Sequence, residues 1–123
     1  MFSQISDSPS QAPDTCQYVQ QPAISNDDCD SAYYFFPSLT TDSMICAGYP
    51  GVGGKGSCKG DSGGPLVCNN EGKAVLAGVV SFGHPNCEGP FPRVLARVTH
   101  VLDWIKSHMV DFERRKRNKP SIL

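Results

Sequence analysis

Apolar residues occur in short runs separated by turn-forming residues over most of the chain, and only the C-terminal part shows a longer period. The polar sequence Asn-Asn-Glu-Gly at 69–72 predicts a hairpin turn between two such runs. Another strand is predicted within residues 16–25, ending near Pro22. The short apolar runs themselves predict strands over residues 65–68, 74–82 and 92–98.

Two segments have helical features. The polar cluster at 26–28 suits the start of a short helix that we expect from Asp28 to about Phe36. Near the C-terminus, apolar residues recur at helical spacing and predict an amphipathic helix whose apolar side packs on a core. These residues are Val98, Val101, Leu102, Ile105, Met109 and Phe112.

Length and composition give the organisation of the chain. With 123 residues, one domain with a modest core is expected. Residues 1–15 are rich in Ser, Gln, Pro and Asp and are interpreted as a loop or disordered lead-in. The folded part is placed at 16–110, and 111–123 is interpreted as a solvated basic tail. A net charge of −1 argues against nucleic acid as a partner, and no apolar run is long enough to cross a membrane.

Six cysteines, at positions 16, 29, 46, 58, 68 and 87, are many for a cytosolic domain. Because no two of them form a CxxC pair, disulfides in an oxidising compartment are favoured over a metal site, and no cofactor is expected. The N-terminus has neither the basic nor the apolar region of a signal peptide. We therefore expect a secreted protein whose natural N-terminus lies further upstream.

The chemistry of the chain is concentrated between Gly56 and Pro65, which read Gly-Ser-Cys-Lys-Gly-Asp-Ser-Gly-Gly-Pro. Glycine and proline at these positions exclude a regular helix or strand. If the N–H groups of Gly60 and Ser62 point the same way, they bind a developing oxyanion beside the Ser62 hydroxyl. That is the layout of an acyl-transfer nucleophile, and the alternative is a glycine-rich turn with an incidental serine.

The run Gly-Asp-Ser-Gly-Gly-Pro, preceded by Ser-Cys-Lys, resembles the nucleophile loop of the chymotrypsin-like (trypsin-like) serine proteases. Residues 41–48 resemble a strand of that family, and 101–106 resemble its C-terminal helix. The resemblance covers about residues 16–110, which correspond to the second of the family's two barrels. It implies an all-β fold: a single six-stranded antiparallel Greek-key barrel with a C-terminal α-helix, the first barrel being absent.

The resemblance also assigns roles. It implies that Ser62 is the catalytic nucleophile and that Gly60 and Ser62 donate to the oxyanion. Asp61 becomes the carboxylate that receives the new N-terminus when a zymogen is activated. The segment Ser81-Phe82-Gly83 pairs with the backbone of a peptide or protein substrate as an added strand.

The base of such an enzyme is not recognisable here. The family carries its catalytic His and Asp on the first barrel, and none of His84, His100 and His108 lies in a matching motif. We therefore expect this chain alone to be inactive or nearly so, as the nucleophile-bearing half of a serine endopeptidase whose partner is the N-terminal barrel of the same protease. The alternative is a non-catalytic, protease-like binding or regulatory module.

The resemblance also implies two disulfides, Cys29–Cys46 and Cys58–Cys87. It places the usual partner of Cys68 upstream of this chain, so that Cys68 is expected to be left unpaired. Cys16 stands where the family more often has an apolar residue. A bond between Cys16 and Cys68 is not supported by the family pattern, and their pairing stays open.

The specificity pocket is the last expectation. The resemblance places its walls at 56–59, 81–83 and 92–95, with Gly56, Ser57, Lys59 and Arg93 among the substrate-binding residues. Gly56 stands where trypsin-like enzymes carry Asp, and Arg93, with Lys59 on the rim, resembles the granzyme B type of pocket. A guanidinium in an apolar slot binds carboxylates, so cleavage after acidic residues is favoured over large apolar ones. The alternative is an Arg93 that turns away to Glu88 or solvent and leaves a blocked or chymotrypsin-like pocket.

Overall fold

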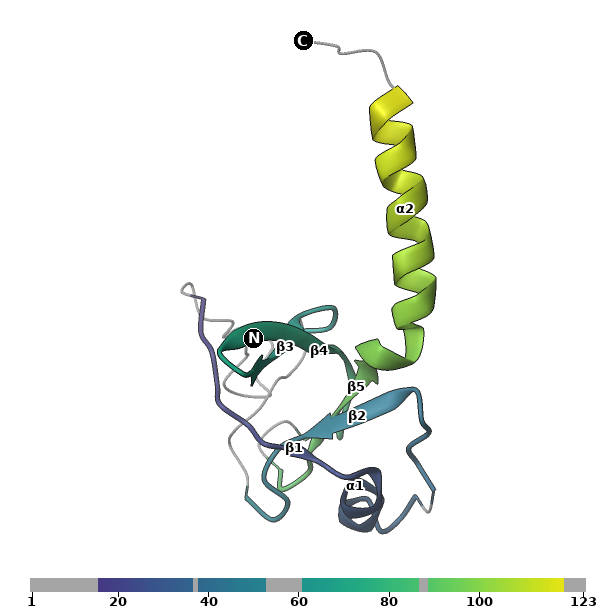
Figure 1. The fold of residues 1–123 in the computed structure, drawn as a ribbon. Helices are drawn as coiled ribbons and strands as arrows, with labels where there is room; N and C mark the ends of the chain where they lie inside the picture. Colours follow the sequence, from purple (N-terminus) through teal and green to yellow (C-terminus); the bar gives the residue numbers. More distant parts are fainter. Residues whose placement is uncertain (1–15, 37, 53–60, 87–88, 119–123) are drawn as a thin grey trace.

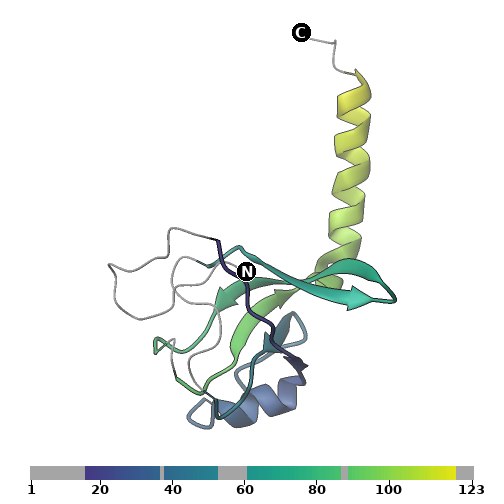
Figure 2. The ribbon, with the colours of Figure 1, turned by 90° about the vertical axis from the view of Figure 1, so that its left-hand side faces the viewer.

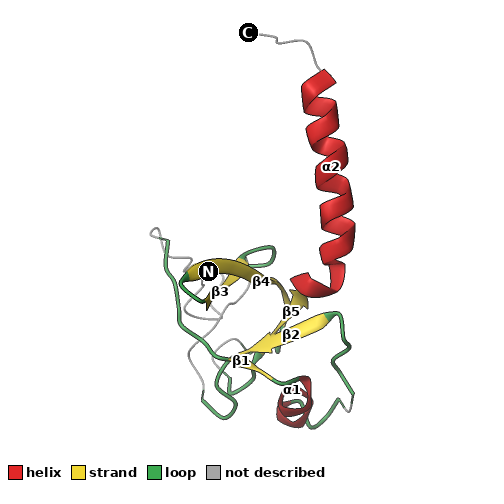
Figure 3. Cartoon of the chain, in the orientation of Figure 1, coloured by secondary structure: helices red, strands yellow, loops and turns green. Residues whose placement is uncertain are grey.

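The computed structural model describes residues 16–36, 38–52, 61–86 and 89–118. They form one antiparallel sheet in the order β1-β2-β5-β4-β3 (Figures 1 and 3). The strands are β1 (Ala23–Ile24), β2 (Met44–Ala47), β3 (Pro65–Asn70), β4 (Lys73–Phe82) and β5 (Arg93–Arg97). The helices are α1 (Asn26–Ala32), the 3₁₀ helix η1 (Val98–Val101) and α2 (Leu102–Asn118).

The fold class expected from the sequence is confirmed, since the chain is mostly antiparallel sheet with a helix at its C-terminal end. The sheet is open rather than closed. Among the described residues there are five strands, and β1 and β3 lie at opposite edges of the sheet without pairing to each other. The six-stranded closed barrel that the resemblance implied is therefore not formed by the described residues.

The core lies on both faces of the sheet. Successive residues of a strand point to opposite faces, and β5 shows this in its middle. Val94 packs with Cys29, Tyr33 and Cys46 on one face, the face that α1 covers. Leu95 packs with a second buried cluster, made of Ala47, Leu66 and Val80, on the other. β5 is therefore the strand around which both halves of the core are built.

The short helix α1 begins and ends earlier than the sequence predicted. Ser25 is its N-cap and accepts the backbone N–H of Asp28 at 3.1 Å. The helix ends at Ala32 instead of near Phe36, because the aromatic residues 33–36 leave the helix to pack their rings. Pro37 adds to this, since the residue before a proline is disfavoured in helical conformation.

The predicted strand at residues 16–25 is also displaced. The chain has no regular structure from 16 to 22, and pairing begins after Pro22, at Ala23 opposite Ala47. The expected β3–β4 hairpin is present, with Glu71 and Gly72 both at positive φ (52° and 82°). Asn69 Oδ1 accepts the N–H of Gly72 at 2.8 Å, which closes this two-residue turn.

A disulfide links α1 to β2 through Cys29 and Cys46, the pair that the resemblance implied, with their Cα atoms 6.2 Å apart. The second expected pair, Cys58 and Cys87, lies outside the described residues. Cys16 is exposed and Cys68 is half-buried, and both are free thiols.

The C-terminal helix corrects the prediction that its apolar stripe packs on the core. No residue of α2 is buried, and the helix runs away from the sheet in both views (Figures 1 and 2). Only Leu102 and Ile105, near its start, are half-buried. The helix continues to Asn118, so the run of cations interpreted as a tail forms its last turns. Within the described segments, no helix is long and apolar enough to cross a membrane.

Candidate functional site

The nucleophile loop enters the described structure at Asp61 and forms a tight turn before β3. The N–H of Gly64 donates to the carbonyl of Asp61 at 2.8 Å, and the N–H of Gly63 donates to the carbonyl of Val80 at 2.9 Å. The N–H of Val80 returns a bond to the carbonyl of Gly64 at 2.9 Å. The turn is therefore held to Val80 of β4 by hydrogen bonds from both Gly63 and Gly64.

Both glycines of this turn are required by its geometry. Gly63 has a φ of +85°, which side chains with a Cβ rarely adopt. A Cβ on Gly64 would lie 2.8 Å from the carbonyl oxygen of Asp61. The result is that Asp61 is buried, with 3% of its surface exposed, while the next residue, Ser62, is exposed. The turn presents the serine to solvent and directs the carboxylate inward.

Several predicted site residues lie outside the described residues. These are Gly56, Ser57, Lys59 and Gly60, together with Cys58 and Cys87. Of the two predicted oxyanion donors, the structure thus describes only Ser62. The remaining site residues, Asp61, Ser81, Phe82, Gly83 and Arg93, are all described.

The end of β4 lies directly beyond the serine turn. β3 pairs with β4 as far as Val79, opposite Pro65, and the turn itself bonds to Val80. On its other side β4 pairs with β5 up to Phe82, with a bulge at Ser81. The segment Ser81-Phe82-Gly83 therefore follows the position of Ser62 along a strand whose β3 side is no longer covered by β3.

Arg93 reaches toward this segment rather than toward solvent. It is the first residue of β5 and only 8% of its surface is exposed. Its Nη1 donates to the carbonyl of His84 at 3.0 Å. A Cβ on Gly83 would lie 2.2 Å from that Nη1 and 2.6 Å from Cδ, so only glycine at 83 leaves room for this side chain. Glu88, the alternative partner, lies outside the described residues.

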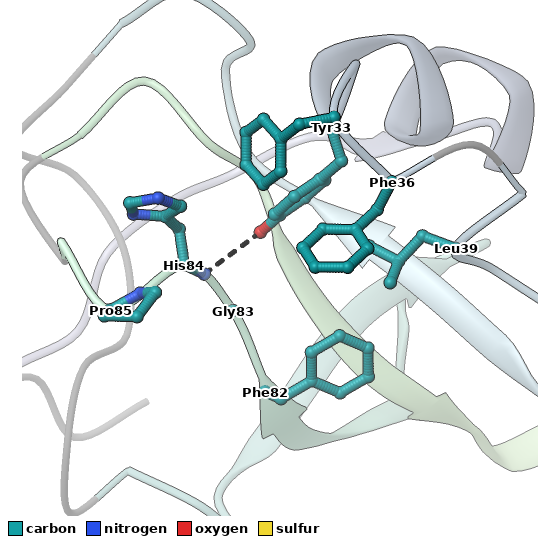
Figure 4. A pocket seen from close by; sticks show the side chains of 8 residues that line it. Tyr33, Phe36, Leu39, Phe82, Gly83, His84 and Pro85 are labelled. Carbon is teal, nitrogen blue, oxygen red and sulfur yellow. Dashed lines mark hydrogen bonds between the residues drawn. The ribbon is translucent and has the colours of Figure 1, made fainter.

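Tyr33 joins the two walls near Arg93, a role that the sequence did not reveal. Its hydroxyl donates to the carbonyl of Pro92 and accepts the N–H of His84 at 3.2 Å (Figure 4). Burial raises the pKa of Tyr33, although the His84 N–H and the positive charge of Arg93 act in the opposite direction. Tyr33 therefore stays protonated at neutral pH and keeps its donor for Pro92.

An aromatic pocket of about 210 Å³ adjoins the same segment. Figure 4 shows Phe82 on one side of it and Phe36 and Leu39 on the other, with Tyr33 and His84 at the end. The His84 ring stacks on Phe91, with centroids 4.2 Å apart and planes at 18°. The only signal for this pocket in the sequence was the aromatic run at 33–36.

The histidines remain apart from the serine. His84 belongs to the aromatic pocket, His100 lies in η1, and His108 in α2 packs its ring on Trp104 at 4.1 Å. In the part of the chain that the structure describes, none of them is hydrogen-bonded to Ser62. Among the same described residues, no group of three or more His, Cys, Asp and Glu side chains is placed to hold a metal ion.

An exposed serine on a glycine turn, preceded by a buried aspartate, agrees with what comparison with known proteins finds. The family model described as Trypsin matches residues 5–105. The chain belongs to the trypsin family.

Several curated members of this family are similar to it. Trypsin 5G1 of Aedes aegypti is 45% identical over 98 residues, which are 80% of this chain and 35% of that protein. Trypsin-1 of Astacus astacus is 44% identical over 98 residues, 80% of this chain and 40% of that protein. Trypsin I-P1 of Gallus gallus is 43% identical over 97 residues, which are 79% of this chain and 36% of that protein. The chain spans well under half the length of these trypsin-family relatives.

Proposed function

We propose that this chain is the nucleophile-bearing half of a serine endopeptidase that works through an acyl-enzyme. The observation that carries the proposal is the turn at Asp61–Gly64, which exposes Ser62 beside the uncovered end of β4. Ser62 attacks the scissile carbonyl, and the N–H groups of Gly60 and Ser62 hold the oxyanion. Residues 16–110 would form the C-terminal barrel, between a lead-in at 1–15 and a basic segment at 111–123.

The base comes from elsewhere in the complete enzyme. A serine hydroxyl needs a histidine within hydrogen-bonding distance, and none of the described histidines bonds to Ser62. We assign the histidine and its orienting aspartate to an N-terminal barrel of the same protease. The 123-residue chain by itself is then inactive or nearly so. Its disulfide suits a secreted enzyme.

Asp61 is proposed as the activation carboxylate of the complete protease. It is buried one residue before the proposed nucleophile, at the entry to the serine turn. In the complete protease it would receive the new N-terminus released by activation, and this ion pair would fix the position of the oxyanion donors Gly60 and Ser62.

The substrate backbone would add to the sheet at Ser81-Phe82-Gly83. This segment follows the serine turn on the side of β4 that β3 no longer pairs with, which is the geometry of strand addition. The aromatic pocket beside Phe82 and Gly83 would take an apolar side chain of the same substrate. Neither contact fixes the residue after which cleavage occurs.

Arg93 is proposed to make that choice, in favour of acidic residues. Arg93 is buried, and its Nη1 and Cδ lie close to Gly83, at the boundary of the substrate segment. Nη1 donates to the His84 carbonyl, and the planar guanidinium is the group that binds a carboxylate through paired N–H bonds. Gly56, Ser57 and Lys59 would complete the pocket. If Arg93 serves only to bind His84, the pocket instead favours large apolar residues.

A fluorophosphonate probe on the complete protease tests the central assignment. We expect labelling of the enzyme and its loss in Ser62→Ala, while Ser107→Ala, which changes an exposed serine on α2, keeps its label. Labelling that persists in Ser62→Ala contradicts the assignment. A complete protein that folds and is never labelled would instead support the alternative, a protease-like binding or regulatory module.

A further inference from the structure

Two buried side chains bond to the backbone of His84, one at each of its polar groups. The hydroxyl of Tyr33 accepts the His84 N–H at 3.2 Å, a contact drawn in Figure 4, and Nη1 of Arg93 donates to the His84 carbonyl at 3.0 Å. The same hydroxyl donates to the carbonyl of Pro92, the residue that precedes Arg93. These hydrogen bonds and the peptide link from Pro92 to Arg93 therefore form one closed ring.

The side chains of this ring are enclosed within the described chain. Tyr33 and Arg93 have 3% and 8% of their surfaces exposed, and Pro92 is fully buried. Protein that packs on the outside of the chain covers surface and exposes none, so these side chains stay enclosed in a longer protein with the same fold. Their arrangement is thus a property of this sheet and its loops rather than of what packs on them.

Tyr33 is itself held in place by the core. Its N–H donates to the carbonyl of Cys29 at 3.1 Å at the end of α1, and the disulfide joins Cys29 to Cys46 of β2. Its ring packs in the same buried cluster as these two cysteines and Val94 of β5. The tyrosine is therefore tied to one helix and two strands of the fold.

Both ends of the Arg93 side chain depend on the Tyr33 hydroxyl. The Pro92 carbonyl belongs to the peptide bond that carries Arg93, so its bond to Tyr33 fixes where the arginine begins. At the other end, the bond from the His84 N–H fixes the residue whose carbonyl receives Nη1. A side chain that is ordered beforehand loses less conformational freedom when it binds a ligand. The result is an arginine that is already arranged before a carboxylate binds.

We propose that Tyr33 is a positioning residue for specificity, whose hydroxyl holds Arg93 in the orientation that binds an acidic side chain of the substrate. This inference rests on the proposed function, in which Arg93 selects the residue before the cleaved bond. It gives Tyr33 a part in selection and none in the chemical step at Ser62. Because the two partners of the hydroxyl are 51 and 59 positions away, no local motif signals this role.

Removing the hydroxyl alone tests the proposal on the complete protease. Tyr33→Phe keeps the ring that lines the aromatic pocket. It should raise KM about tenfold for peptides with Asp before the cleaved bond, the effect of one buried hydrogen bond, and change kcat by less than about twofold. Peptides with Leu at that position should be cleaved as by the parent. Tyr34→Phe, which changes an exposed tyrosine, should leave the cleavage of both peptides unaffected.

A second substitution shows whether Tyr33 acts through Arg93. In the Arg93→Gly background, Tyr33→Phe should have no further effect on the ratio of kcat/KM between Asp and Leu peptides. Nuclear magnetic resonance supplies a readout without catalysis, on the 123-residue chain. The guanidinium protons of Arg93 should exchange slowly with solvent in the parent and at least about tenfold faster in Tyr33→Phe. Arg93→Lys identifies their signal by its disappearance.

Several outcomes would overturn the proposal. Equal losses for Asp and Leu peptides in Tyr33→Phe would mean that the hydroxyl only stabilises the fold. A loss of the same size in the Arg93→Gly background, or unchanged exchange of the Arg93 protons, would mean that Tyr33 does not position the arginine. Fast exchange of these protons in the parent chain contradicts the proposal without any variant. Failure of the proposed specificity appears in the parent enzyme instead, as a preference for Leu over Asp, and removes this role as well. Circular dichroism checks that each variant is folded at the temperature of the assays.

Discussion

The hydroxyl of Tyr33 accepts the backbone N–H of His84 at 3.2 Å, across 51 positions of sequence. The same hydroxyl donates to the carbonyl of Pro92. His84 follows the proposed substrate segment, and Pro92 precedes Arg93. One buried side chain thus connects the two walls between which the proposed specificity residue lies.

Replacing Tyr33 by Phe should destabilise the chain. The change leaves the His84 N–H and the Pro92 carbonyl without their partner in a buried site, and such unsatisfied groups cost about 1–3 kcal/mol. Urea denaturation of the 123-residue chain measures the change in the free energy of unfolding. Tyr34→Phe is the matched control, because Tyr34 is 80% exposed and its loss should have almost no effect. Equal losses in both variants would mean that the bridge contributes nothing.

Alkaline pH should lower the free energy of unfolding through deprotonation of Tyr33. Burial raises the pKa of Tyr33 above the ordinary value of 10.0, so the folded state holds this proton more tightly than the unfolded state. Its contribution is fully present below pH 10 and is lost as the pH rises through the folded pKa. The free energy of unfolding should therefore fall more steeply above pH 10 in the parent than in Tyr33→Phe. The Tyr34→Phe variant should follow the parent, and identical slopes in all three proteins would refute the assignment.

Gly83→Ala should destabilise the chain by displacing the side chain of Arg93. The new Cβ would overlap Nη1 and Cδ of Arg93, so the arginine has to swing out and give up its bond to His84. Overpacking of this kind costs about 1–3 kcal/mol. A double-mutant cycle with Arg93→Ala measures the coupling, and the loss from Gly83→Ala should largely disappear when Arg93 is already truncated. Additive losses would show that the two positions do not compete for space.

Arg93→Gly should change which peptides the complete protease cleaves. If Arg93 binds the acidic side chain, its removal should lower kcat/KM for peptides with Asp before the cleaved bond by about 30-fold or more, as expected for loss of a buried charge pair. Peptides with Phe or Leu there should be cleaved equally well or better. Arg93→Lys keeps the charge without the planar fork and should recover only part of the loss. A parent enzyme that already prefers Phe or Leu would show that Arg93 has a structural role only.

The local features of the chain could be predicted from local sequence. The hairpin at 69–72 and the serine turn both depend on residues within a few positions of one another, whereas the cap of α1 was expected at 26–28 and is Ser25. The glycines at 63 and 64 illustrate this, because a positive φ and a close carbonyl leave no alternative residue. The errors at α1 and near Pro22 are errors of boundary, since packing of the aromatic run and pairing with β2 decide where each element ends or begins.

What the sequence determined by itself was the family and the antiparallel class, because a dense local motif carries both, and the proposal of Ser62 as the nucleophile rests on the same motif. The tertiary structure alone decided that Tyr33 bridges His84 and Pro92, that Arg93 turns toward Gly83, and that the apolar stripe of α2 stays in solvent. The physical reason is the distance in sequence between the residues that interact. An apolar stripe has the same period whether or not another surface covers it, and a buried tyrosine looks like any aromatic residue until the chain brings its distant partners within hydrogen-bonding distance.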